Sequence, residues 1–87
     1  MFMKEAIITG KVGLHARPAT FLIQKANEFS GSIWLEKDER RVNAKSLLGV
    51  LSLGVGKDEK VRIISDGPDE TEAVNTLIEL INSDFAE

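Results

Sequence analysis

The 87-residue chain contains no cysteine, so it can form no disulfide and offers no thiolate to a metal ion. A secreted domain of this size would often depend on disulfides, and their absence therefore favours a reducing compartment. His15 is the single histidine, which rules out a zinc site of the usual histidine and cysteine kind within one chain. We expect neither a metal nor a cofactor.

Long apolar runs and an excess of basic residues are also missing. No run approaches the roughly 18 residues that span a bilayer, and the first ten residues, MFMKEAIITG, do not have the features of a signal peptide. We therefore expect a cytoplasmic protein without membrane insertion. The 11 Lys and Arg against 14 Asp and Glu give a net charge of -3, which argues against direct binding of nucleic acid. Protein or small-molecule partners are favoured.

The length allows one domain over residues 1–87, because no cluster of Gly or Pro divides the chain. Each predicted element has only one apolar side to bury. We therefore predict an α+β fold of the order βαββαβα, an open-faced β-sandwich with three helices on one face of a four-stranded antiparallel sheet. The apolar spacing predicts strands over 1–9, 32–36, 41–44 and 60–65, and helices from Pro18 to before Gly31, over 46–53, and after the turn at 66–70.

The candidate chemistry lies in GLHARPAT, immediately before the first helix. The backbone N–H groups of Ala16 and Arg17 are among the unpaired donors of the first turn and, with the positive end of the helix dipole, make an anion site. The dipole disfavours an imidazolium, which leaves the ring of His15 neutral and nucleophilic. The planar guanidinium of Arg17 can grip two phosphate oxygens. These groups could accept a phosphoryl group, although a lone loop histidine is otherwise an ordinary surface residue, and the helix start makes the two interpretations about equal.

A second candidate site lies at Ser46, which heads a short apolar segment and, without other information, is an ordinary N-cap. A two-turn surface helix can bury only one face, so we expect Leu47, Leu48 and Leu51 to be exposed, unless a neighbour covers both sides. Phe21 points away from the apolar stripe of its own helix, and we expect it to be exposed near His15. Together these side chains are the predicted partner-binding patch.

GLHARPAT at residues 13–20, followed by a helix and then by NAKSLLGVLSLG at residues 43–54, resembles the HPr family. These are the histidine-containing phosphocarriers of the bacterial phosphoenolpyruvate-dependent sugar phosphotransferase system, and the match is to the Gram-positive type. The likeness covers essentially the whole chain. It implies that Nδ1 of His15 accepts a phosphoryl group from phosphorylated enzyme I and passes it to enzyme II A domains, with Arg17 stabilising the charge. The protein would then be acted on by enzymes without being one.

The resemblance also implies phosphorylation of Ser46 by HPr kinase/phosphorylase. The added charge should weaken docking to enzyme I and favour a basic pocket on a catabolite control transcription regulator. The alternative is a module like Crh, a paralogue that lacks the active histidine and only regulates; the presence of His15 favours the carrier. Many Gram-positive relatives carry methionine where this chain has Leu48 and Leu51, which leaves the partner repertoire open. We expect a monomer, because a relay must present His15 to partners of different shape.

Overall fold

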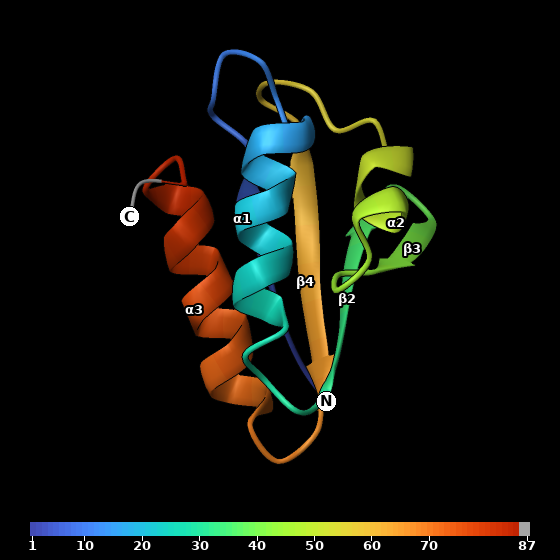
Figure 1. Cartoon of the computed structure of the whole chain (residues 1–87), viewed down its shortest axis with the longest axis vertical. Coiled ribbons are helices and arrows are strands. Elements are labelled where there is room, and N and C mark those ends of the chain that lie inside the picture. Colours follow the sequence, from blue (N-terminus) through green and yellow to red (C-terminus); the bar gives the residue numbers. More distant parts are fainter. Residues whose placement is uncertain (86–87) are drawn as a thin grey trace.

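The computed structural model describes residues 1–85, and its elements follow the predicted order. They are β1 (Phe2–Ile7), α1 (Ala16–Ala26), β2 (Ser32–Lys37), β3 (Arg40–Asn43), α2 (Leu47–Ser52), β4 (Lys60–Asp66) and α3 (Glu70–Asn82). The strands form one antiparallel sheet in the order β1-β4-β2-β3. Figure 1 shows the helices gathered on one side of the strands, which confirms the open-faced sandwich.

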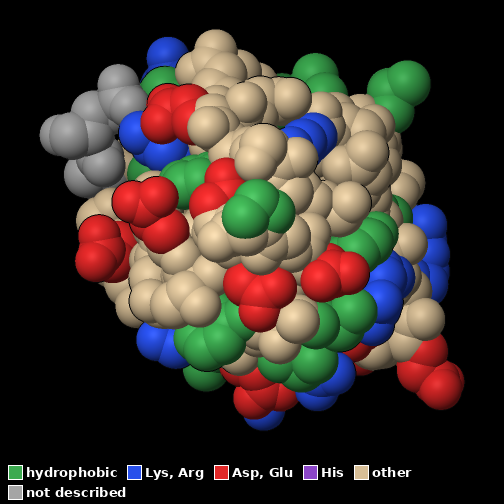
Figure 2. Space-filling model, turned by 90° about the horizontal axis from the view of Figure 1, so that it is seen from below, with side chains coloured by type: hydrophobic (Ala, Val, Ile, Leu, Met, Phe, Trp, Pro, Cys, Tyr) green, Lys and Arg blue, Asp and Glu red, His purple; other side chains and the backbone are tan. Residues whose placement is uncertain are grey.

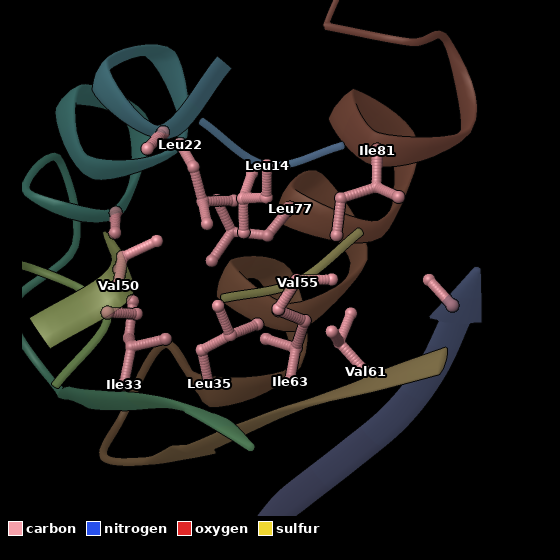
Figure 3. Packing of buried hydrophobic residues seen from close by; sticks show 14 of the residues in the cluster. Leu14, Leu22, Ile33, Leu35, Val50, Val55, Val61, Ile63, Leu77 and Ile81 are labelled. Carbon is pink, nitrogen blue, oxygen red and sulfur yellow. The ribbon is translucent and has the colours of Figure 1, made fainter. Parts of the chain in front are cut away.

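The core fills the space between the sheet and the helices (Figure 3). Alternate residues of β2 and β4, such as Leu35 and Ile63, point towards the helices and are fully buried. They meet buried side chains such as Leu22 from α1 and Leu77 from α3. Alternating burial in β2, and in β4 as far as Ile63, together with one apolar stripe on each long helix therefore accounts for the layers.

The opposite face of the sheet carries a row of alternating charges across all four strands. Arg62 of β4 pairs with Glu5 of β1 at 3.4 Å and with Glu36 of β2 at 3.2 Å, and Glu36 also pairs with Arg41 of β3 at 3.3 Å. The guanidinium of Arg41 lies 5.6 Å from the centre of the Trp34 ring. Trp34 lies on the same face as these charges and thus covers part of it.

Helix α1 differs from the prediction at both ends. It begins at Ala16, two residues before Pro18, since proline is tolerated throughout the first turn where no N–H is needed. It ends at Ala26, with Asn27 as C-cap, whereas the pattern had extended the apolar stripe to Phe29. No helix within residues 1–85 is long and apolar enough to cross a membrane.

Asp69, the residue before α3, is hydrogen-bonded to the turn that follows α1. The end of α1 and the start of α3 lie towards the bottom of Figure 1, the side that Figure 2 views. The Asp69 carboxylate accepts the backbone N–H of Ser30 at 2.9 Å and that of Gly31 at 3.3 Å. The hydrogen bond from the Ser30 amide is the main reason that the pKa of Asp69 lies below its ordinary value. Acidic, basic and hydrophobic side chains are mixed on this face, and no histidine is visible there (Figure 2).

Candidate functional site

His15 is the N-cap residue of α1 and its side chain is exposed. Its backbone is extended, with φ -93°, and its carbonyl oxygen accepts the first helical hydrogen bond, from the N–H of Ala19 at 3.0 Å. The imidazole caps no backbone N–H and has no hydrogen-bond partner within the described part of the chain. The ring is therefore free to meet a partner molecule.

Two residues before His15 set the path of the chain into the helix. Gly13 has φ +71°, and a β-carbon there would lie 2.6 Å from the carbonyl oxygen of Val55 and 2.8 Å from the α-carbon of Gly56. Only glycine fits both the conformation and the space. Leu14 follows with a buried side chain and donates its N–H to the Val55 carbonyl at 2.9 Å. His15 is thus anchored through its predecessor and not through its own ring.

The start of α1 is positively polarised, as the sequence predicts. The N–H groups of Ala16 and Arg17 precede the first paired amide, and an intrahelical bond would need carbonyls that lie before the helix. The guanidinium of Arg17 forms no ion pair and no hydrogen bond within residues 1–85, and its side chain is exposed. Donors and an exposed, unpaired cation beside a free imidazole suit the binding of a dianionic group.

His15, Arg17 and Phe21 line a shallow hollow of about 310 Å³. The loop before His15 and the residues after α3 complete its lining. Phe21 is half-buried and packs on the core, so the expectation of an exposed ring is only partly met. A helical wheel gives the direction of this side chain but not what the rest of the fold lays over it. Lining residues that sequence reasoning missed are Gly10, Lys11, Val12, Gly13, Pro18, Asp84 and Phe85.

Among these additional lining residues, Val12 and the residues after α3 say most about the surface around His15. Val12 is 70% exposed and is the most accessible apolar side chain beside His15. Asp84 and Phe85 reach the hollow because both adopt positive φ, 57° and 62°, which turns the chain back after α3. Val12 lies three residues before His15, so the sequence alone could have indicated this apolar neighbour. The approach of the C-terminal segment had no local signal.

Ser46 occupies the predicted N-cap of α2. Its Oγ accepts the N–H of Gly49 at 3.1 Å, and its carbonyl oxygen accepts the N–H of Val50 at 3.0 Å. The residue is half-buried, and α2 begins at the next position. The hydroxyl is thus already directed at the amides that would face a phosphate on the same oxygen.

The predicted patch on α2 is smaller than expected. Leu47 and Leu48 are 41% and 82% exposed, as predicted, but Leu51 is half-buried against the core. Leu51 packs partly against the core, as Phe21 does, so the expectation of an exposed side chain is only partly met for it. None of the three leucines lines the hollow beside His15. The structure brings Phe21 to the histidine but does not extend that hollow onto α2.

Comparison with protein families gives one match over residues 2–83, to the family described as the PTS HPr component phosphorylation site. The chain belongs to the HPr family. The match confirms the family that GLHARPAT resembles. HPr proteins are phosphocarriers and not catalytic enzymes. A curated HPr-like protein Crh from Halalkalibacterium halodurans is 42% identical, covering 97% of this chain and 100% of that protein. The chain therefore matches the HPr family and is also similar to a Crh protein.

Solved structures of HPr agree with the fold. One HPr from Thermoanaerobacter tengcongensis is 47% identical, with a TM-score of 0.96 over 100% of this chain and 98% of that chain. A second structure from the same organism, described as an HPr dimer, is 49% identical, with a TM-score of 0.79 over 94% of each chain. A relative this similar forms a dimer, so the expectation of a monomer is not upheld. A relay that presents His15 to several partners does not require a monomer.

Proposed function

We propose that this chain is a phosphoryl carrier of the phosphoenolpyruvate-dependent sugar phosphotransferase system. His15 accepts a phosphoryl group from phosphorylated enzyme I and passes it to enzyme II A domains, and residues 1–87 act as a single HPr domain. The observation that carries the proposal is the free, exposed imidazole at the start of α1, next to unpaired amides and the unpaired guanidinium of Arg17. Membership of the HPr family is the reason for proposing the phosphotransferase system.

The transfer needs a nitrogen that carries no proton. Nδ1 of a neutral His15 attacks phosphorus as the bond from phosphorus to its donor on enzyme I breaks, while the other ring nitrogen keeps its hydrogen. The amides of Ala16 and Arg17 and the guanidinium of Arg17 bind the oxygens of the transferred group. The second transfer is the same exchange in reverse, from the His15 nitrogen to the acceptor on the enzyme II A domain. This chain gains and loses one phosphoryl group and turns over no free substrate.

Phosphorylation by enzyme I tests the first step. The purified protein is incubated with phosphoenolpyruvate and enzyme I, and its intact mass is measured before and after mild acid. One phosphoryl group that is lost in acid and never forms on His15→Ala supports the proposal. No modification, under conditions that fully phosphorylate a known HPr, overturns it.

Regulation through Ser46 is the second part of the proposal. HPr kinase/phosphorylase adds a phosphate at the Oγ that caps α2, next to the exposed Leu47 and Leu48. The new charge lies on a surface helix, where it weakens docking to enzyme I and favours a basic pocket on a catabolite control transcription regulator. An acid-stable phosphate formed with ATP and the kinase, and absent in Ser46→Ala, is the expected result.

A purely regulatory role, like that of Crh, is the alternative, and the 42% identity to a Crh protein is the observation that favours it. Under this alternative Ser46 is phosphorylated by the kinase, while His15 accepts nothing from enzyme I. The two incubations therefore separate the roles. Phosphorylation at both residues supports the regulated carrier, and phosphorylation at Ser46 alone supports the regulatory module.

A further inference from the structure

Two side chains outside the histidine hollow, Lys37 and Glu59, hold together the loop of residues 54–59. Lys37 ends β2, and its ammonium group donates to the carbonyl oxygen of Gly54 at 3.1 Å and to Oε1 of Glu59 at 3.0 Å. The same Oε1 accepts the backbone N–H of Gly56. One cation therefore joins both ends of an irregular loop, and one carboxylate oxygen satisfies an amide inside it.

This loop is also the surface on which the segment before His15 rests. The N–H of Leu14 donates to the Val55 carbonyl, and the backbone of Gly56 lies so close to Gly13 that no β-carbon fits between them. In Figure 3 the side chains of Leu14 and Val55 both point into the core. The position of His15 thus depends on where the loop places one carbonyl group and one glycine.

The other end of the histidine loop is bound in the same way. The N–H of Ile8 donates to the carbonyl oxygen of Glu59 at 3.0 Å, and the N–H of Asp58 donates to that of Ile8 at 2.6 Å. Residues 8–14 are therefore hydrogen-bonded at both ends to residues 54–59. In Figure 1 the two loops lie together at the end of the molecule where α1 begins.

The ion pair is better placed to hold the loop than an ordinary surface pair. The Lys37 side chain is only 18% exposed, and Glu59 is 42% exposed. The Gly56 amide first, and the Lys37 ammonium second, hold the pKa of Glu59 below its ordinary value, so this carboxylate is ionised at neutral pH. Exposed ion pairs contribute little by themselves, but this one also satisfies backbone groups of a loop that has no regular structure.

We infer that Lys37 and Glu59 are positioning residues for His15, which fix the Leu14 anchor by closing the loop of residues 54–59. The inference rests on the proposed function of His15. Neither side chain lines the histidine hollow, so neither is expected to touch a phosphoryl group. Their loss therefore slows transfer at a given occupancy of enzyme I and leaves docking nearly unchanged.

The test compares Glu59→Ala and Lys37→Met with the wild type. Glu5→Ala is the matched control, because it removes a carboxylate that pairs with Arg62 at 3.4 Å on the open face of the sheet. Glu59→Gln keeps an acceptor oxygen and should fall between the wild type and Glu59→Ala. Two properties are measured: hydrogen exchange of the Leu14 amide, relative to amides of the β2–β4 ladder, and kcat and KM for phosphorylation by enzyme I.

Both test variants should speed exchange at Leu14 by about tenfold relative to the ladder, as expected for the loss of a hydrogen bond between charged groups that closes a loop. They should also lower kcat by about tenfold, with KM within about twofold of the wild type. Glu5→Ala should change neither property by more than about twofold.

Three results would count against the inference. Exchange at Leu14 that matches Glu5→Ala overturns it, and so does a uniform increase at all amides, which would show a general loss of stability. Faster exchange at Leu14 with an unchanged kcat would show that the loop is held but does not position the histidine. If the wild type accepts no phosphoryl group from enzyme I, the proposed function fails, and exchange at Leu14 alone decides whether Lys37 and Glu59 fix this anchor.

Discussion

The carbonyl oxygen of His15 accepts the N–H of Ala19 at 3.0 Å, so the proposed phosphoryl acceptor is also the residue at which α1 begins. A group bound to the ring therefore lies at the positive end of the helix, where unpaired amides and the guanidinium of Arg17 can reach it. Helix α1 therefore both holds His15 in place and provides donors for the group bound to it. Measurable consequences follow for His15, Arg17 and Ser46, and for Asp69, whose carboxylate binds the turn after α1.

Replacing His15 with alanine should abolish phosphorylation by enzyme I and leave the fold intact. The ring is exposed, caps no amide and has no partner within residues 1–85. The free energy of unfolding should therefore change by no more than about 0.5 kcal/mol, as for other surface substitutions. Urea denaturation measures stability, and intact-mass spectrometry measures phosphorylation. A large loss of stability would mean that the histidine has a structural role.

Replacing Arg17 with lysine should slow transfer more than it weakens docking. Lysine keeps the charge but loses the planar fork that can bind two oxygens at once. We expect kcat for phosphorylation by enzyme I to fall by about tenfold, with a smaller change in KM. The unpaired state of this guanidinium means that no ion pair is lost with it. Equal kcat values for the two proteins would remove Arg17 from the transfer step.

Two substitutions at Ser46 separate capping from charge. Ser46→Ala removes the acceptor of the Gly49 N–H and should cost about 1 kcal/mol of stability. Ser46→Asp keeps an N-cap acceptor and adds a negative charge, so the fold should persist while phosphorylation of His15 by enzyme I slows. Ser46→Ala is the control for the rate. A rate for Ser46→Asp equal to that of Ser46→Ala would contradict the proposed charge repulsion.

The hydrogen bonds from the Ser30 and Gly31 amides to Asp69 predict a dependence of stability on pH. The pKa of Asp69 is lower in the folded protein than the ordinary value of 3.8, so its contribution is present above that value and is lost as the pH falls through the folded pKa. Asp69→Asn should therefore be less stable than the wild type at pH 7, and the difference should shrink at about pH 3. Glu39→Gln, at an exposed turn carboxylate, is the control. A difference for Asp69→Asn that is the same at both pH values would contradict this account.

The order of elements and the positions of His15 and Ser46 at the starts of their helices could be predicted because their signals are local. The apolar spacing of α1 and α3, the proline after His15 and the serine before α2 each act within a few residues. The ends of α1 were less well predicted, since a proline marks the first turn of a helix but not which residue opens it.

Features that depend on distant parts of the chain were not predictable. The partial burial of Leu51 and Phe21 depends on packing against other elements. Asp84 reaches the loop before His15 only because two residues near the C-terminus adopt positive φ. The ion pair between Lys37 and Glu59 joins residues 22 apart in sequence. A charged residue at the end of a strand is ordinarily a solvated one, and no periodic pattern indicates its partner.

The most direct test of the carrier is to follow one phosphoryl group through the protein. The protein is phosphorylated with enzyme I and phosphoenolpyruvate, separated from both, and mixed with a purified enzyme II A domain, and the intact masses of both proteins are measured over time. The account predicts that the group leaves His15 and appears on the A domain in equal amount, and that His15→Ala delivers none. A protein that never acquires an acid-labile phosphoryl group, or that keeps it in the presence of the A domain, would contradict the central claim.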